Sequence, residues 1–227
     1  MDRENAEAAE NKKKQQISQS STQPDDDAVV RATAKSSHVN NRKIKPLNAA
    51  HFLTHFPKHP HCPVCQRCRV QISVVRKIEV DHSGPASEEF GDIITCDWSV
   101  LKFETQSRAG RVDQLVILDR ATRWLYAYAT DTRAHEEIMM AFRQYLGSNL
   151  PTPKLVYTDN GPEFIKAFKL LDFSADTSQP HRPTTNGVAE RAQRTVKEGT
   201  SCLLSQAGLQ PDWWVEASRC YCFLHNV

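Results

Sequence analysis

An apolar strand, a turn and the start of a helix follow one another in residues 155–164, which read Leu-Val-Tyr-Thr-Asp-Asn-Gly-Pro-Glu-Phe. The apolar residues 155–157 favour a buried strand, and Asp159-Asn160-Gly161 is a turn sequence. A short helix is predicted over residues 164–171. Asp159 therefore stands at the end of a buried strand, which leaves its side chain little freedom and suits a metal site.

Further apolar patterns surround this stretch. Three strands are predicted before it, and helices are predicted on both sides of it. Of the last two helices, the first is long and amphipathic and the second is rich in aromatic residues. The predicted strands cover residues 93–96, 115–118 and 124–129, and the predicted helices cover 134–146, 187–205 and a final segment from 211. The order of three strands, a helix, a strand and then helices predicts an α/β domain with a mixed sheet.

Three carboxylates occupy informative positions in this pattern. Asp97 and Asp159 end apolar strands, and Glu190 lies on the polar face of the helix over 187–205. Three carboxylates can hold two divalent ions that activate an attacking oxygen and stabilise a leaving oxygen in phosphoryl transfer. The alternative for each aspartate, taken singly, is a turn-forming role without metal.

The segments around these carboxylates resemble the catalytic core of retroviral-type integrases, above all those of copia-like and gypsy-like long-terminal-repeat retrotransposons. The matching segments are Ile94-Thr95-Cys96-Asp97, Val156–Phe164, Thr185–Arg191, the hairpin stretch Leu118–Trp124 and the closing stretch Asp212–Ala217. The resemblance covers about residues 50–227. It implies a ribonuclease H-like fold, in which a mixed sheet is flanked by helices.

The resemblance also implies an activity, which is divalent-metal-dependent DNA 3′-end processing and strand transfer, the chemistry of DNA integration and transposition. Asp97, Asp159 and Glu190 then form the catalytic triad that binds Mg²⁺ or Mn²⁺. Asp119 is expected to order the hairpin, and Glu163 is the substitute third ligand if Glu190 is misplaced. The implied partners are the element's DNA ends, target DNA and further copies of the chain.

One spacing departs from the family. Thirty residues separate Asp159 from Glu190, about five fewer than the family usually has, and five residues make about 1.4 helical turns. A deletion within the helix would rotate Glu190 away, whereas a deletion in a loop would be harmless. Two alternatives therefore stay open. The first is a catalytically inactive, truncated or domesticated nucleic-acid-binding relative, and the second is a ribonuclease H-like nuclease.

A cluster of cysteines and histidines precedes the predicted core. His51-x3-His55 and Cys62-x2-Cys65 have the chelate spacings of a structural zinc site. Only six residues separate the two pairs, fewer than in integrase amino-terminal modules. The site is therefore either compact or uses another ligand, and the candidates for that ligand are His59, His61 and Cys68.

Basic residues are concentrated in the middle of the chain. Residues 28–80 contain ten lysines and arginines and one acid, although the whole chain has a formal net charge of +2. Such a segment suits a phosphate backbone, or is simply solvated. The resemblance places DNA contacts at His181, Arg182, Arg191, Arg194 and Lys197. The alternative for the helical positions is a solvated face with Glu190 and Arg194 as an i,i+4 pair.

We expect three regions: a disordered polar tail over 1–45, a basic Cys/His zinc-module-like segment over 46–80, and an integrase core over 85–227 that is truncated at its carboxyl end. No run approaches the roughly 20 apolar residues of a membrane helix, and the first thirty residues lack the apolar region of a signal peptide. Short basic runs at 12–14 and 42–45 resemble nuclear-import patches. The expected location is the nucleus and cytoplasm, without secretion or a membrane partner.

Overall fold

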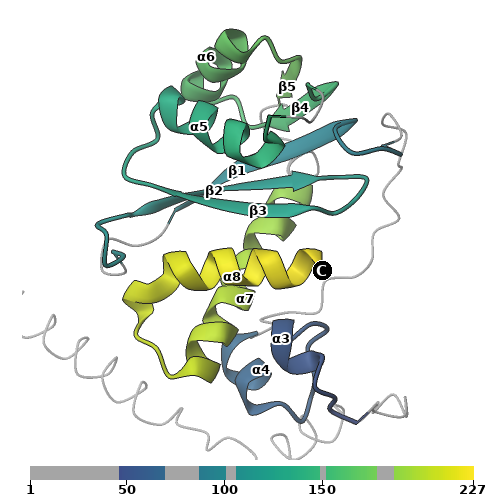
Figure 1. The fold of residues 1–227 in the computed structure, drawn as a ribbon, viewed down its shortest axis with the longest axis vertical. Coiled ribbons are helices and arrows are strands. Elements are labelled where there is room, and N and C mark those ends of the chain that lie inside the picture. Colours follow the sequence, from purple (N-terminus) through teal and green to yellow (C-terminus); the bar gives the residue numbers. More distant parts are fainter. Residues whose placement is uncertain (1–45, 70–86, 101–105, 149–151, 178–186) are drawn as a thin grey trace, which may run out of the picture. The chain divides into compact units, whose positions relative to one another are not determined.

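The computed structural model describes residues 46–69, 87–100, 106–148, 152–177 and 187–227 (Figure 1). The expected tail over 1–45, most of the basic stretch after residue 69, and both His181 and Arg182 lie outside the described residues. Residues 46–227 form one compact unit, which contains every element described below. None of the described helices is long and apolar enough to cross a membrane.

A five-stranded mixed sheet forms the centre of this unit. Its strands are β1 (Ile93–Val100), β2 (Asp113–Asp119), β3 (Leu125–Thr130), β4 (Leu155–Thr158) and β5 (Ala175–Thr177). Their order is β3-β2-β1-β4-β5, with β1 antiparallel to β2, β2 antiparallel to β3, β4 parallel to β1, and β5 parallel to β4. This arrangement is the ribonuclease H-like fold, and the predicted α/β class with a mixed sheet is confirmed.

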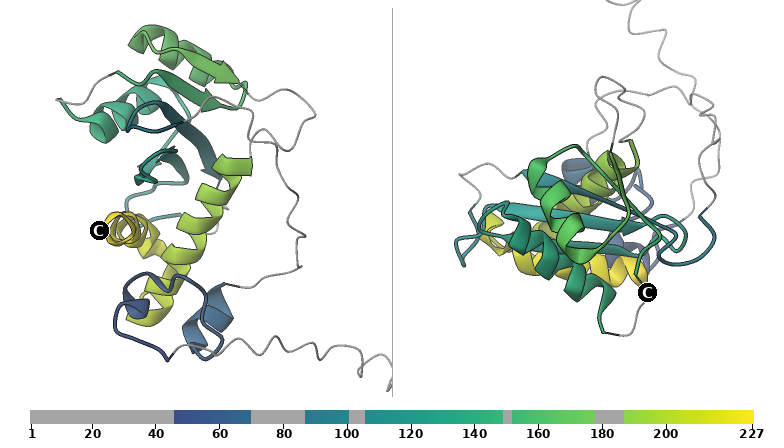
Figure 2. Two further views of the ribbon diagram at one scale, coloured as in Figure 1. Left: turned by 90° about the vertical axis from the view of Figure 1, so that its right-hand side faces the viewer. Right: turned by 90° about the horizontal axis from the view of Figure 1, so that it is seen from above.

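Helices cover both faces of the sheet. They are α3 (His51–Thr54), α4 (Pro63–Cys68), α5 (His135–Leu146), α6 (Pro162–Leu171), α7 (Gly187–Ala207), the 3-10 turn η3 (Pro211–Trp213) and α8 (Trp214–Asn226). Helices α5 and α6 lie over one face, and α7 and α8 lie over the other (Figures 1 and 2). Each face therefore has its own apolar core.

The alternation of side chains along β1 assigns them to the two cores. Ile94, Cys96 and Trp98 are buried in the core beneath α5 and α6. The residues between them point the opposite way, and Asp97 pairs across the ladder with Val116, which belongs to the core beneath α7 and α8. Because residues opposite each other in an antiparallel ladder face the same side, Asp97 faces helix α7.

Element ends agree with local signals in the sequence. Helix α5 ends at Gly147, whose φ of +65° is a conformation that glycine adopts at little cost. The fifth strand, β5, has three described residues, which are mostly exposed at the sheet edge. Short strands of this kind are common at sheet edges, where they offer few unpaired backbone groups.

Asp119 orders the hairpin between β2 and β3. Its carboxylate is fully buried and accepts hydrogen bonds from the backbone N–H and the hydroxyl of Thr122, both at 2.7 Å. It also accepts a hydrogen bond from the N–H of Gly91 at 2.9 Å, just before β1. Asp119 therefore joins the hairpin to the entry of the central strand.

Candidate acidic site and metal centre

Asp97 lies within β1 and not at the strand end that the sequence predicted, and Asp159 directly follows the last residue of the neighbouring strand β4. In the parallel ladder of β1 and β4, Thr95 pairs with Tyr157, and two residues further along each strand direction stand Asp97 and Asp159. Neighbouring strands are about 4.8 Å apart, and in-register residues of parallel strands point to the same face. The backbones of Asp97 and Asp159 are therefore brought close together where β4 ends.

Glu190 approaches this edge from helix α7. It lies in the first turn of the helix and is exposed. Gln193, one turn later, donates a hydrogen bond from Nε2 to the carbonyl of Trp98, at 3.0 Å, so this part of α7 passes the end of β1. Residues three apart lie on the same side of a helix. Glu190 thus belongs to the side of α7 that meets the strand bearing Asp97.

The three carboxylates are nevertheless not gathered into one tight group. Among the residues that the structure describes, only a set of histidines and cysteines has its ligand atoms all within 4.8 Å of one another. Three like charges repel unless a cation lies between them. The register of the strands thus brings the backbones of Asp97 and Asp159 together, while the three side chains keep a wider separation.

The charge state of Asp159 reflects its surroundings. Burial raises its pKa, and the nearby carboxylate of Glu163 raises it further, while the N–H of Gly161 and the Arg133 guanidinium act in the opposite direction. Arg133 is itself held by two hydrogen bonds to Asp113, at 3.0 and 3.1 Å. Asp159 therefore has both acidic and basic neighbours. The sequence around Asp159 could not predict Arg133 as a neighbour, because Arg133 belongs to a different loop.

The predicted DNA-contact residues on α7 all face solvent. Arg191, Arg194 and Lys197 are exposed, whereas the buried side of the helix carries small and apolar residues. Within the described part of the chain, Glu190 and Arg194 do not form the ion pair that the sequence allowed. The cations of α7 are accordingly free of Glu190 and available to an external anion.

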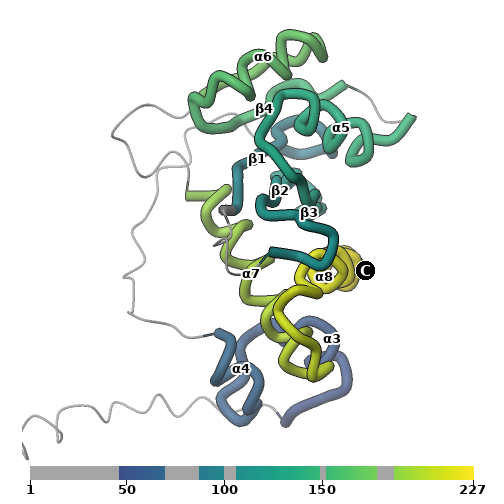
Figure 3. The backbone as a smooth tube through the Cα atoms, turned by 90° about the vertical axis from the view of Figure 1, so that its left-hand side faces the viewer, coloured from purple at the N-terminus to yellow at the C-terminus, as the bar shows by residue number. Residues whose placement is uncertain are grey.

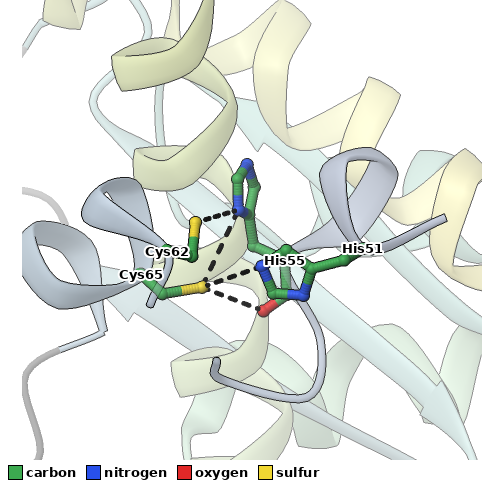
Figure 4. Close-up of side chains that lie close together, drawn as sticks. All are labelled: His51, His55, Cys62 and Cys65. Carbon is green, nitrogen blue, oxygen red and sulfur yellow. Dashed lines mark hydrogen bonds between the residues drawn. The ribbon is translucent and has the colours of Figure 1, made fainter. Parts of the chain in front are cut away.

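The second site is the Cys/His cluster, where four buried side chains converge (Figure 4). His51 and His55 come from α3 and its carboxyl-terminal cap, and Cys62 and Cys65 come from the amino-terminal cap and first turns of α4. The short gap of six residues suffices because His55 takes a left-handed conformation that reverses the chain. Of the other candidate ligands, His59 and His61 are not in the four-residue group, and Cys68 donates to the carbonyl of Ser201.

The donor atoms of this cluster are spaced as tetrahedral zinc requires. The Nε2 atom of His51 lies 3.4 Å from the Sγ of Cys65, and the Nδ1 atom of His55 lies 3.5 Å from the Sγ of Cys62 and 3.7 Å from that of Cys65. Zinc bonds of about 2.0 Å to nitrogen and 2.3 Å to sulfur, at tetrahedral angles, place the two donors about 3.5 Å apart. Two imidazoles and two thiols are also the donor set of structural zinc sites.

Burial favours the neutral form of both kinds of donor, so it lowers the pKa of a histidine and raises the pKa of a cysteine. Burial lowers the pKa of His51, helped by the neighbouring rings of His55 and His59 and by Arg69, which favours the neutral imidazole that binds metal. Burial raises the pKa of Cys65, which favours its neutral thiol in the absence of metal. Metal binding at this cluster must consequently release protons.

Known proteins with similar sequences come from retroelements. The chain is 25% identical over 199 residues to the "Retrovirus-related Pol polyprotein from transposon RE2" of Arabidopsis thaliana, a match that covers 84% of this chain and 13% of that protein. It is 28% identical over 201 residues to the "Pol polyprotein" of feline endogenous virus ECE1, covering 82% and 18%. This chain is thus similar in sequence to parts of retroviral and retrotransposon Pol polyproteins.

Two further comparisons complete this picture. The chain is 25% identical over 202 residues to the Gag-Pol polyprotein of baboon endogenous virus, covering 82% of the chain and 11% of that protein. Among solved structures, the catalytic core domain of BIV integrase is similar with a TM-score of 0.41 and 16% identity, covering 56% of this chain and 80% of that one. No protein-family model matches the chain. It spans less than a fifth of the length of these polyproteins.

Proposed function

We propose that this chain is an integrase-type polynucleotidyl transferase, which processes DNA 3′ ends and joins them to target DNA. The observation that carries the proposal is that the ladder of β1 and β4 brings Asp97, within β1, close to Asp159, just after β4, with the Glu190 end of α7 passing the same edge. The similarity to Pol polyproteins over more than four fifths of the chain supports it.

Asp97, Asp159 and Glu190 would hold Mg²⁺ or Mn²⁺, because carboxylate oxygens are the ligands that these hard cations prefer. The bound ions supply charge stabilisation for the attacking and leaving oxygens of an in-line displacement. Arg191, Arg194 and Lys197, exposed beyond Glu190 on α7, would bind the DNA backbone and orient its phosphates. Direct attack by water or a 3′-hydroxyl requires no covalent intermediate with the protein.

The first experiment measures strand transfer with the full chain, Mg²⁺ and duplex oligonucleotides that carry the terminal sequences of its own element. Asp97→Asn should lower the rate at least about a hundredfold, since metal-borne charge stabilisation is worth several kcal/mol. DNA binding should be nearly unchanged, because the cations of α7 remain. Activity retained in Asp97→Asn would overturn the assignment of this site.

A second experiment identifies the third carboxylate. Glu190→Gln should abolish transfer, and Glu163→Gln, which changes an acid beside Asp159 on α6, should keep most of it. The reverse result would move the third ligand to Glu163. Both substitutions leave the side-chain volume almost unchanged, so the comparison isolates the charge.

A catalytically inactive DNA-binding relative is the second candidate function. It is favoured by the wider separation of the three carboxylates and by the short spacing between Asp159 and Glu190. Such a protein would bind DNA with a strong salt dependence, since phosphate counterions are released on binding. It would neither nick nor join DNA in Mg²⁺ or Mn²⁺, under conditions where its binding is saturated.

We also propose that the cluster of His51, His55, Cys62 and Cys65 binds one structural zinc ion. The purified chain should contain about one equivalent of zinc, and Cys65→Ser should release it. A preparation free of metal that retains its folded state would refute the zinc proposal.

We further propose that copies of the chain associate on DNA. Light scattering with and without DNA measures this association.

A further inference from the structure

Helix α7 extends beyond the acidic site and meets the Cys/His cluster at its other end (Figure 3). Arg69, which caps α4 through its N–H to the carbonyl of Cys65, is only 6% exposed. Its guanidinium pairs with Glu198 of α7 at 3.2 Å and donates to the carbonyl of Thr54 at 3.2 Å. It also donates to the hydroxyl of Tyr221 of α8 at 3.4 Å. One buried cation thus ties the cluster to both helices.

The second link involves a candidate ligand itself. The His55 ring turns Nδ1 toward the sulfurs of Cys62 and Cys65 (Figure 4), and its Nε2 is hydrogen-bonded to the side-chain carbonyl oxygen of Gln206. A carbonyl oxygen only accepts hydrogen bonds, so Nε2 carries the proton. The lone pair of the neutral ring is then on Nδ1, directed toward the sulfurs.

We propose that Gln206 is a positioning residue of the metal centre, and that through it helix α7 links the metal centre to the acidic site. The proposal rests on the proposed binding of zinc. Glu190 and Gln206 are 16 residues apart on one helix, about 24 Å at 1.5 Å per residue. Partners that hold the second nitrogen of a ligating histidine set its tautomer and orientation, and their loss typically lowers metal affinity 10- to 100-fold.

Two consequences follow for the folded chain. Zinc affinity depends on a residue that lies 141 positions after Cys65 and outside the Cys/His segment. In return, bound zinc stabilises the last turns of α7, because the ion holds His55 in the orientation that bonds to Gln206. Coupling of this kind is reciprocal by thermodynamic linkage.

The test uses the full chain and zinc alone, with affinity measured by competition against a chromophoric chelator. Gln206→Leu should weaken zinc binding roughly 10- to 100-fold, and Gln206→Glu, which keeps an acceptor oxygen, should restore it. Ser205→Ala is the matched control, because Ser205 accepts a hydrogen bond from Arg67 but contacts no candidate ligand. Gln206 is exposed, so these variants should fold.

Two readouts separate positioning from a merely structural effect. Nitrogen NMR of the His55 ring should show protonated Nε2 in the wild-type chain and a mixture of tautomers in Gln206→Leu. Hydrogen exchange should show that zinc slows the amides of residues 200–206 in the wild-type chain and much less so in Gln206→Leu. The proposal would be overturned if Gln206→Leu bound zinc with wild-type affinity, or if zinc did not change the rate of amide hydrogen exchange in α7 of the wild-type chain. Wild-type affinity in Cys65→Ser would instead refute zinc binding at the cluster.

Discussion

The carboxylate of Asp92 lies at the entry to the central strand, one residue before β1. Its carboxylate accepts hydrogen bonds from the N–H groups of Glu88 and Glu89, both at 2.9 Å, and pairs with Lys154 at 2.6 Å, just before β4. These contacts, the N–H of Glu89 first and Lys154 second, lower the pKa of Asp92 to about 2. One ionised side chain thereby joins the segments that lead into β1 and β4.

This pKa gives a pH-dependent prediction. A carboxyl group whose pKa is lower in the folded state stabilises the fold above its unfolded pKa, near 3.8, and loses this contribution as the pH falls toward 2. Asp92→Asn should therefore unfold at a lower urea concentration than the wild type at pH 7. The difference should shrink between pH 4 and pH 2. Asp172→Asn, at an exposed helix cap, is the control for the substitution itself; a constant difference for Asp92→Asn would contradict the prediction.

At the scale of elements, the crossing of α7 and α8 decides where the long helix lies. Gly199 of α7 faces the ring of Tyr221 so closely that a Cβ atom at this position would overlap the ring atoms. Tyr221 is fully buried in the core beneath these helices. The close approach of the two helices therefore requires a residue without a side chain, although glycine weakens a helix interior.

Gly199→Ala tests this crossing. Alanine favours an isolated helix by about 1 kcal/mol over glycine, but overlap with a buried ring typically costs 1–3 kcal/mol. We expect the variant to have a lower free energy of unfolding, measured by urea denaturation. Gly187→Ala is the matched control, since nothing lies within 4 Å of the added carbon, and it should be neutral or stabilising. A stabilised Gly199→Ala would show that the helices can separate at little cost.

For the whole molecule, helix α7 is the common support of both sites. It packs on β1 and β2 in its first half and on α4 in its second half, with α8 crossing between (Figures 1 and 3). Because residues 46–227 form one compact unit, a ligand that binds the folded Cys/His cluster stabilises the sheet as well. The two sites are therefore expected to unfold together.

Zinc should consequently raise the stability of the entire unit. At a free zinc concentration 100-fold above Kd, binding to the native state alone adds about 2.7 kcal/mol. We expect one cooperative thermal transition that moves to higher temperature with zinc and back with a chelator, observed both by the tryptophans of the core and by helix content. The shift should vanish in Cys65→Ser and diminish at low pH, where protons compete for the thiols. Two separate transitions would show that the cluster and the sheet are independent.

The elements and the candidate ligands follow from local information. Apolar runs predict four of the strands and the three longest helices. They do so because the spacing of apolar residues along a short stretch of chain differs between a strand and a helix. The pairs His51 and His55, and Cys62 and Cys65, are recognisable because their spacing suits chelation. The structure places β3 at Leu125–Thr130 instead of 124–129 and begins α6 at Pro162 instead of 164, and it adds the strand β5, because exposed edges and turns leave a weaker pattern in the sequence.

The sequence by itself thus determined the fold class, the position of Asp159 at the end of a strand and the four donors of the cluster, whereas Asp97, expected to end a strand, lies in the middle of β1. Only the tertiary structure decided the register that sets Asp97 beside Asp159, the approach of Arg133 and Glu163 to Asp159, and the bond from Gln206 to His55. Pairing between strands and packing between helices join residues that are far apart in the chain. Such contacts depend on how the apolar faces of whole elements fit together, which no short stretch of sequence specifies.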